Sequence, residues 1–213
     1  MSLIVAGAPV ATPGLEVISW LDDPHVQRVT DGKARTVRPI SVVLHTVHGK
    51  RGPLRPGSKA SARAEMYARY QARTPREVSW HLTVDTDSTI LQSADVALWH
   101  CWHAPPTNAW SVGIELVQDD DGSLYADQIA STVRLLDLLC AQLTIPRRVP
   151  VSAPGVPRTD TVRTWCAPKE GGRSDRWAGV LGHRNVTKSR GPGDPGDHVF
   201  LALLAAGYEG VAL

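Results

Sequence analysis

The chain runs Ile-Ser-Val-Val-Leu-His-Thr over residues 40–46, and this stretch decides the fold class. A short run rich in β-branched residues is typical of a buried central strand. A second run, Ser-Val-Gly-Ile-Glu-Leu-Val over residues 111–117, also predicts a strand. Its alternation places Val112, Ile114 and Leu116 on one face. We therefore expect a β-sheet built around these two segments.

Helices and further strands are expected on both sides of these segments. Residues 126–143 carry an apolar stripe at spacings of three and four, which predicts a helix that ends before Pro146. The composition also favours a helix at 58–72, a hairpin at 78–92, a strand at 178–181 and a helix at 198–206. This order predicts an α/β fold: a single domain with a central mixed β-sheet flanked by helices.

Two stretches stand apart from this pattern. Residues 1–37 alternate apolar patches with Pro, Gly and charge, and we expect an N-terminal extension packed on a domain that spans 38–213. Residues 147–177 are rich in Pro, Gly, Arg and Asp, which predicts a long insertion loop. Such a loop either shapes a substrate groove or covers the sheet.

The composition excludes several classes of function. The 213 residues carry 23 Lys+Arg against 21 Asp+Glu, so we expect no nucleic-acid partner held by dense phosphate contacts. No apolar run approaches the roughly 20 residues of a membrane helix, and the first 13 residues do not read as a secretory signal. We expect no membrane partner, and a protein that is cytoplasmic in the producing cell or acts on cell wall after release or delivery.

The three cysteines, Cys101, Cys140 and Cys166, are too few and too widely spaced for a disulfide framework or a CxxC metal site. Buried free thiols are the expected state. The sequence does not fix their redox state.

Four residues offer metal-binding or acid–base chemistry: His45 at a strand end, Glu115 within a later strand, and His183 and Asp194 at the two ends of a loop. Two imidazoles and a carboxylate are typical ligands of a catalytic Zn²⁺, with a fourth position left for water. Each residue also has an ordinary alternative. Either histidine can be a hydrogen-bonded structural residue, Glu115 can face water on an edge strand, and Asp194 can belong to a turn. Periodicity alone does not join them into one site.

Five collinear segments resemble the type 2 class of zinc-dependent N-acetylmuramoyl-L-alanine amidases, which share the peptidoglycan recognition protein fold. The segments are residues 42–46 (VVLHT), 78–85 (VSWHLTVD), 102–104 (WHA), 108–116 (NAWSVGIEL) and 182–196, which begins GHRNV and ends GDPG. The resemblance covers roughly residues 38–206.

The resemblance implies a site and a reaction. His45, His183 and Asp194 would be the Zn²⁺ ligands, with water or the substrate carbonyl in the open position. Glu115 would face the metal-bound water as the general base or as the residue that orients it. The family hydrolyses the amide between N-acetylmuramic acid and the L-alanine of the stem peptide. We therefore expect peptidoglycan or muropeptides as substrate.

The chain departs from the family pattern at two positions. Many members place a lysine where this chain has Pro192, so we expect Arg190 to stabilise the developing oxyanion, with Lys188 as the other cation of the loop. Some members carry a tyrosine where Trp80 stands, and Trp cannot do acid–base work. His81, the next residue, is expected to be structural.

The segment around residues 99–108 suggests substrate contacts. Trp102 and His103 are expected to line the groove, where Trp can stack on a sugar and His can donate a hydrogen bond. Asn108 is expected to contact the substrate, with a turn-forming role as the alternative. Trp99 is expected in the core. His48, close after the first strand, is the residue most easily mistaken for His45.

A second function remains open from the sequence. The same fold can serve as a recognition module that binds muropeptides without cutting them, and the complete ligand set favours catalysis. A zinc amidase acting on an unrelated amide is a third reading, because Pro192 replaces the family lysine. The sequence does not choose among wall recycling, phage lysis and antibacterial delivery, and it leaves the oligomeric state and the stem-peptide and sugar preference undetermined.

Overall fold

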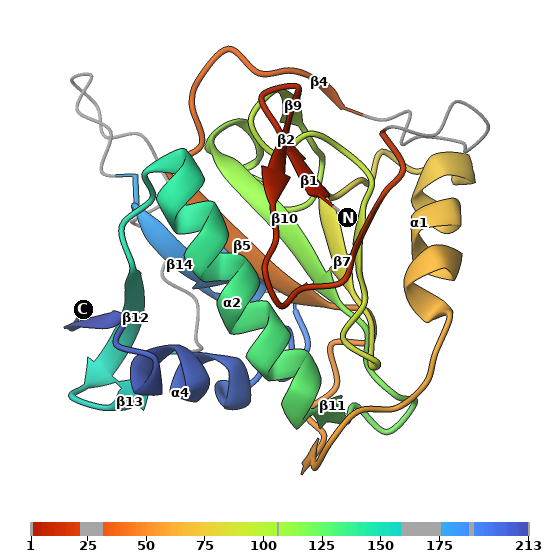
Figure 1. Cartoon of the computed structure of the whole chain (residues 1–213). Helices are drawn as coiled ribbons and strands as arrows, with labels where there is room; N and C mark the ends of the chain where they lie inside the picture. The colour runs from red at the N-terminus through yellow and green to blue at the C-terminus, as the bar shows by residue number, and fades with distance from the viewer. Residues whose placement is uncertain (1, 22–31, 106, 159–175, 188–189, 213) are drawn as a thin grey trace.

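The computed structural model describes residues 2–21, 32–105, 107–158, 176–187 and 190–212. Its centre is a six-stranded sheet in the order β14-β5-β10-β7-β8-β3 (Figure 1). In that order the strands are Gly179–Gly182, Ser41–Thr46, Ser111–Leu116, Leu82–Val84, Ile90–Gln92 and Val17–Ser19. β14, β5, β10 and β7 run parallel, whereas β8 is antiparallel to β7. The predicted α/β domain with a mixed sheet is confirmed.

The two faces of the sheet have different roles. One face of β5 and β10 packs under α2 (Ala126–Leu143), the long helix in the foreground of Figure 1. This face carries Val42, Leu44, Val112 and Ile114, which are completely buried in the main core. Because side chains alternate along a strand, His45 and Glu115 project from the opposite face. The apolar face thus anchors the two strands whose other face bears the polar residues.

The remaining elements are short. The other helices are α1 (Arg63–Arg73), a 3₁₀ turn (Asn108–Trp110), α3 (His183–Val186) and α4 (Asp197–Ala205). Three small strand pairs are β1 (Ser2–Val5) with β2 (Ala8–Ala11), β4 (Lys33–Ala34) with β9 (Trp99–His100), and β6 (Leu54–Arg55) with β11 (Leu124–Tyr125). Among the described residues, none of the helices has both the length and the apolar character needed to cross a bilayer.

The N-terminal residues contribute a strand that the sequence patterning did not predict. β3 pairs with β8 and forms one edge of the central sheet, and Leu3 of β1 is completely buried in the main core. A strand of three residues is too short to show an alternating pattern, so only the pairing partner reveals it. The domain boundary at residue 38 stays a prediction.

The predicted loop over 147–177 is wrong for its first part. β12 (Arg148–Ala153) lies between β13 (Val156–Pro157) and β15 (Glu209–Ala212) in a three-stranded sheet. Prolines at positions 150 and 157 argued against strands, because proline cannot donate to a ladder. Residues 159–175, which include Cys166, lie outside the described residues.

Candidate active site

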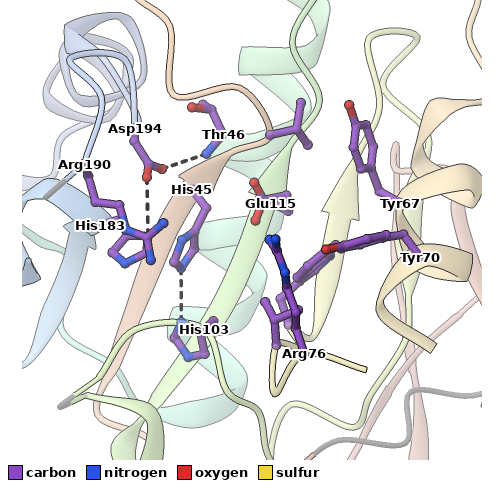
Figure 2. Close-up of a pocket in the computed structure, with 13 residues that line it drawn as sticks. His45, Thr46, Tyr67, Tyr70, Arg76, His103, Glu115, His183, Arg190 and Asp194 are labelled. Atoms are coloured by element: carbon purple, nitrogen blue, oxygen red, sulfur yellow. Dashed lines mark hydrogen bonds and ion pairs between the residues drawn. The ribbon is translucent and has the colours of Figure 1, made fainter. Parts of the chain in front are cut away.

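His45 and Glu115 occupy matching positions on neighbouring parallel strands. In the register of β5 against β10, Glu115 lies opposite His45, so both side chains leave the same face of the sheet. His183 follows β14, the strand on the other side of β5, and begins α3. Strand order therefore brings three residues together that are far apart in the sequence, as Figure 2 shows.

Asp194 enters the site on a loop that packs tightly against the end of β5. Its Oδ1 accepts a hydrogen bond from the backbone N–H of Thr46 at 2.9 Å. The hydroxyl of Thr46 donates to the carbonyl of Gly193 at 2.5 Å. A Cβ at position 193 would overlap the backbone carbonyl of Lys50, so only glycine permits this approach. Loop and strand thus fix the Asp194 carboxylate on two sides.

These elements bring His45, His183 and Asp194 into one buried cluster. One candidate ligand atom from each residue lies within 4.8 Å of the others, and all three residues are buried. Nδ1 of His183 lies 3.3 Å from Oδ2 of Asp194, and the two imidazole centroids are 4.3 Å apart. Nε2 of His183 is buried with no hydrogen-bond partner among the described residues. A buried imidazole nitrogen without a partner, on a ring that also contacts a carboxylate, fits a site that binds a cation.

The electrostatics of the site favour a neutral imidazole at His45. Burial lowers the pKa of His45 well below its ordinary value, and His183, His103 and Arg190 lower it further. The pKa of His103 is lowered in the same direction, again mainly by burial. A neutral imidazole keeps the lone pair that a metal ligand needs.

Glu115 has the opposite shift. Burial raises the pKa of its carboxyl group well above the ordinary value, the nearby Asp194 raises it further, and Arg190 acts in the other direction. A carboxyl group with a raised pKa holds a proton more strongly than one in water, a property suited to a general base.

The cluster lines one side of a cavity of about 410 Å³. Glu115, Arg190 and His103 also line it. The opposite side, drawn in Figure 2, carries Tyr67 and Tyr70 of α1 and Arg76 from the loop that follows.

The sequence did not indicate that Tyr67, Tyr70, Arg76 or Trp80 would line the cavity. The two tyrosines stand three positions apart on a helix, which marks one helical face, but the same spacing is typical of any helix that packs on a sheet. Nothing in the sequence says that this face borders a cavity.

Of the three residues predicted to contact substrate, only one lines this cavity. His103 lines the cavity, whereas Trp102 and Asn108 are not among its lining residues. Asn108 is buried, and its Oδ1 accepts the backbone N–H groups of His103 and Ala104 at 2.9 and 2.6 Å. These hydrogen bonds are those expected from the turn-forming alternative, and contact of Asn108 with substrate stays a prediction. Trp102 lies against His100, with ring centroids 4.6 Å apart.

Three further residues that the sequence singled out, His81, His48 and Trp99, do not belong to the cluster. His81 is completely buried, and its Nδ1 accepts the backbone N–H of Gly113, as expected of a structural residue. His48 is outside the cluster, and its Nε2 lies 3.9 Å from Oδ1 of Asp120. Trp99 is only partly buried rather than in the core. Lys188, the alternative to Arg190, lies outside the described residues.

Two of the three cysteines are buried free thiols, as the sequence predicted. Cys101 and Cys140 are free and buried, and burial raises the pKa of Cys101 to about 12. Cys166 lies outside the described residues.

Comparison with known families identifies the family of the chain. The sequence profile of the N-acetylmuramoyl-L-alanine amidases matches residues 35–197, which contain the whole cluster. The chain belongs to this family. The amidase thus acts on peptidoglycan, at the amide between N-acetylmuramic acid and L-alanine. No curated protein matches the amidase sequence.

Solved structures show that the amidase shares its fold with proteins of distant sequence. A crystal structure of an AmpD derivative aligns with a TM-score of 0.54 at 16% identity, over 96% of this chain and 98% of that chain. The endolysin N-acetylmuramoyl-L-alanine amidase LysCS from Clostridium intestinale aligns with a TM-score of 0.53 at 13% identity, over 92% of this chain and 97% of that chain.

Proposed function

We propose that the amidase is zinc-dependent and that His45, His183 and Asp194 hold the ion. The observation that carries the proposal is the convergence of their ligand atoms within 4.8 Å, with one imidazole nitrogen buried and unpartnered. Two imidazoles and one carboxylate are a donor set typical of a catalytic zinc site. Bound there, Zn²⁺ would polarise the scissile carbonyl and make water a stronger nucleophile near neutral pH.

Glu115 is proposed as the general base. Its position opposite His45 in the strand register puts the carboxylate beside the cluster and in the same cavity. The carboxylate takes a proton from the attacking water as the water oxygen bonds to the lactyl carbonyl carbon. The same group then gives that proton to the nitrogen of L-alanine as the C–N bond breaks. Water therefore supplies the oxygen of the new carboxylate and the proton of the new amine.

Arg190 is proposed to stabilise the negative charge that develops on the carbonyl oxygen. Its guanidinium group lines the cavity, and it influences the pKa of both His45 and Glu115. Pro192 stands at the position of the family lysine and has an uncharged side chain. A guanidinium can replace an ammonium in this role, because its N–H groups donate hydrogen bonds to an anionic oxygen.

Metal analysis combined with turnover of a muropeptide tests the proposal. We expect about one zinc per chain, release of a peptide that begins with L-alanine, loss of activity with a chelator and recovery on adding zinc. His45→Ala should lose both the metal and the activity. A muropeptide-binding module without catalysis would bind the substrate and release no peptide, and full activity in metal-free protein would rule out zinc dependence.

A further inference from the structure

His103 contacts a proposed zinc ligand directly. Its Nδ1 lies 3.1 Å from Nε2 of His45, both residues are buried, and Figure 2 shows the two rings joined by this contact. One of the two nitrogens must donate and the other accept. The direction decides which nitrogen of His45 is left with a lone pair.

A chain of hydrogen bonds sets that direction. The Ser111 hydroxyl has its shortest contact with the carbonyl of Thr107, at 2.8 Å, and a carbonyl can only accept. Having donated there, Ser111 Oγ accepts from Nε2–H of His103, 3.2 Å away. A neutral His103 with its proton on Nε2 has a lone pair on Nδ1. Nδ1 therefore accepts Nε2–H of His45.

The backbone around His103 is built to hold this ring. Asn108 accepts the backbone N–H of His103, which fixes the start of the turn, and Ser111 at its end contacts the ring. On β10, a Cβ at Gly113 would lie 2.6 Å from Cγ of His103. Because Gly113 has no side chain, the imidazole of His103 can occupy the space beside its Cα.

We propose that His103 is a positioning residue that keeps the proton of His45 on Nε2 and so leaves Nδ1 as the nitrogen that binds the metal. This inference rests on the zinc site proposed above. It replaces the expected role of His103 as a hydrogen-bond donor to substrate, because both ring nitrogens are already engaged with protein atoms. Residues that orient a metal-binding histidine typically change metal affinity 10- to 100-fold when they are removed.

Zinc affinity of defined variants tests the proposal, measured by competition with a chromophoric chelator. His103→Leu should weaken zinc binding roughly 10- to 100-fold. His103→Asn should recover most of the loss, because its Oδ1 can occupy the place of Nδ1 and accept from His45. Ser111→Ala removes the acceptor for Nε2–H of His103 and should weaken binding in the same direction, to a smaller extent.

Ser41→Ala is the matched control. Ser41 is the register partner of Ser111 on β5, is equally buried, and has a hydroxyl without a hydrogen-bond partner among the described residues. The same chemical change outside the hydrogen-bond chain should leave zinc affinity and kcat unchanged. If Ser41→Ala and Ser111→Ala weaken zinc binding equally, packing rather than hydrogen bonding is responsible and the proposal fails.

Two readouts separate this inference from the zinc proposal and from substrate binding. In the metal-free protein, long-range ¹H–¹⁵N spectra should show His45 protonated at Nε2 in the wild type and a tautomer mixture in His103→Leu. Unchanged tautomers would overturn the inference even if zinc binds. A raised KM with unchanged zinc affinity in His103→Leu would restore the substrate-contact role, whereas wild-type protein that binds no zinc would contradict the proposed function itself.

Discussion

Asp194 Oδ1 accepts the backbone N–H of Thr46, a residue 148 positions earlier in the chain and next to His45. This hydrogen bond orients the carboxylate from the protein side, so the second oxygen faces His183. A ligand fixed by the backbone of the neighbouring strand loses little conformational freedom when a metal binds. The relationship explains how a loop residue can join a rigid site.

Gly193→Ala should disrupt that relationship. The new Cβ would overlap the Lys50 carbonyl, so the loop must move away from β5 and take Asp194 with it. We expect a destabilisation of about 1–3 kcal/mol and a clear fall in zinc affinity. Gly196→Ala is the control, since a Cβ there meets its nearest atom at 3.9 Å. Denaturant unfolding and zinc titration of both variants check the prediction, which fails if they behave alike.

Glu115→Gln should strongly reduce turnover while zinc stays bound. The amide has the size of the carboxyl group but cannot take a proton from water, so kcat should fall by about 10²–10⁴. Removing an ionisable group whose pKa is strongly raised by burial should not lower thermal stability. Steady-state kinetics, metal analysis and a melting curve measure the three effects. A variant that keeps wild-type kcat would exclude Glu115 as the base.

Arg190→Ala should lower kcat about 10²-fold with a smaller change in KM, since the proposed contact forms as charge develops on the carbonyl oxygen. Arg190→Lys keeps a cation and should retain part of the activity. Kinetics on one muropeptide substrate distinguish the outcomes. Equal kcat in wild type and Arg190→Ala would remove this residue from the mechanism.

Buried His81 should make folding stability sensitive to acid. Burial, followed by the nearby Arg35, lowers its pKa to about 3, against about 6.5 in an unfolded chain. Between these values the unfolded state binds the extra proton, so stability is complete above pH ~6.5 and is lost as the pH falls toward 3. His81→Asn should reduce the slope of unfolding free energy against pH by about 1.4 kcal/mol per pH unit near pH 5.

Urea unfolding of wild type and His81→Asn at several pH values between 4 and 7 measures this difference. His45 and His103 contribute to the slope in both proteins, because their pKa values are also lowered, so only the difference reports on His81. Parallel curves for the two proteins would contradict the assignment.

The sequence by itself determined the two central strands and the long helix. Val112 and Ile114 alternate with Gly113 and Glu115, and this period survives folding because a strand with one face in the core cannot shift by a single residue. The collinear motifs indicated the family, and that resemblance implied that His45, His183 and Asp194 would lie together in one site.

Only the tertiary structure decided what surrounds those residues. β3 is a strand because β8 offers it a partner, and β12 is a strand despite its proline because it has neighbours on both sides. His103 contacts His45 because Ser111 gives its ring a hydrogen-bond partner and Gly113 leaves space for it. Most of these contacts depend on segments that only the folded chain brings together, so short-range patterns of polarity do not predict them.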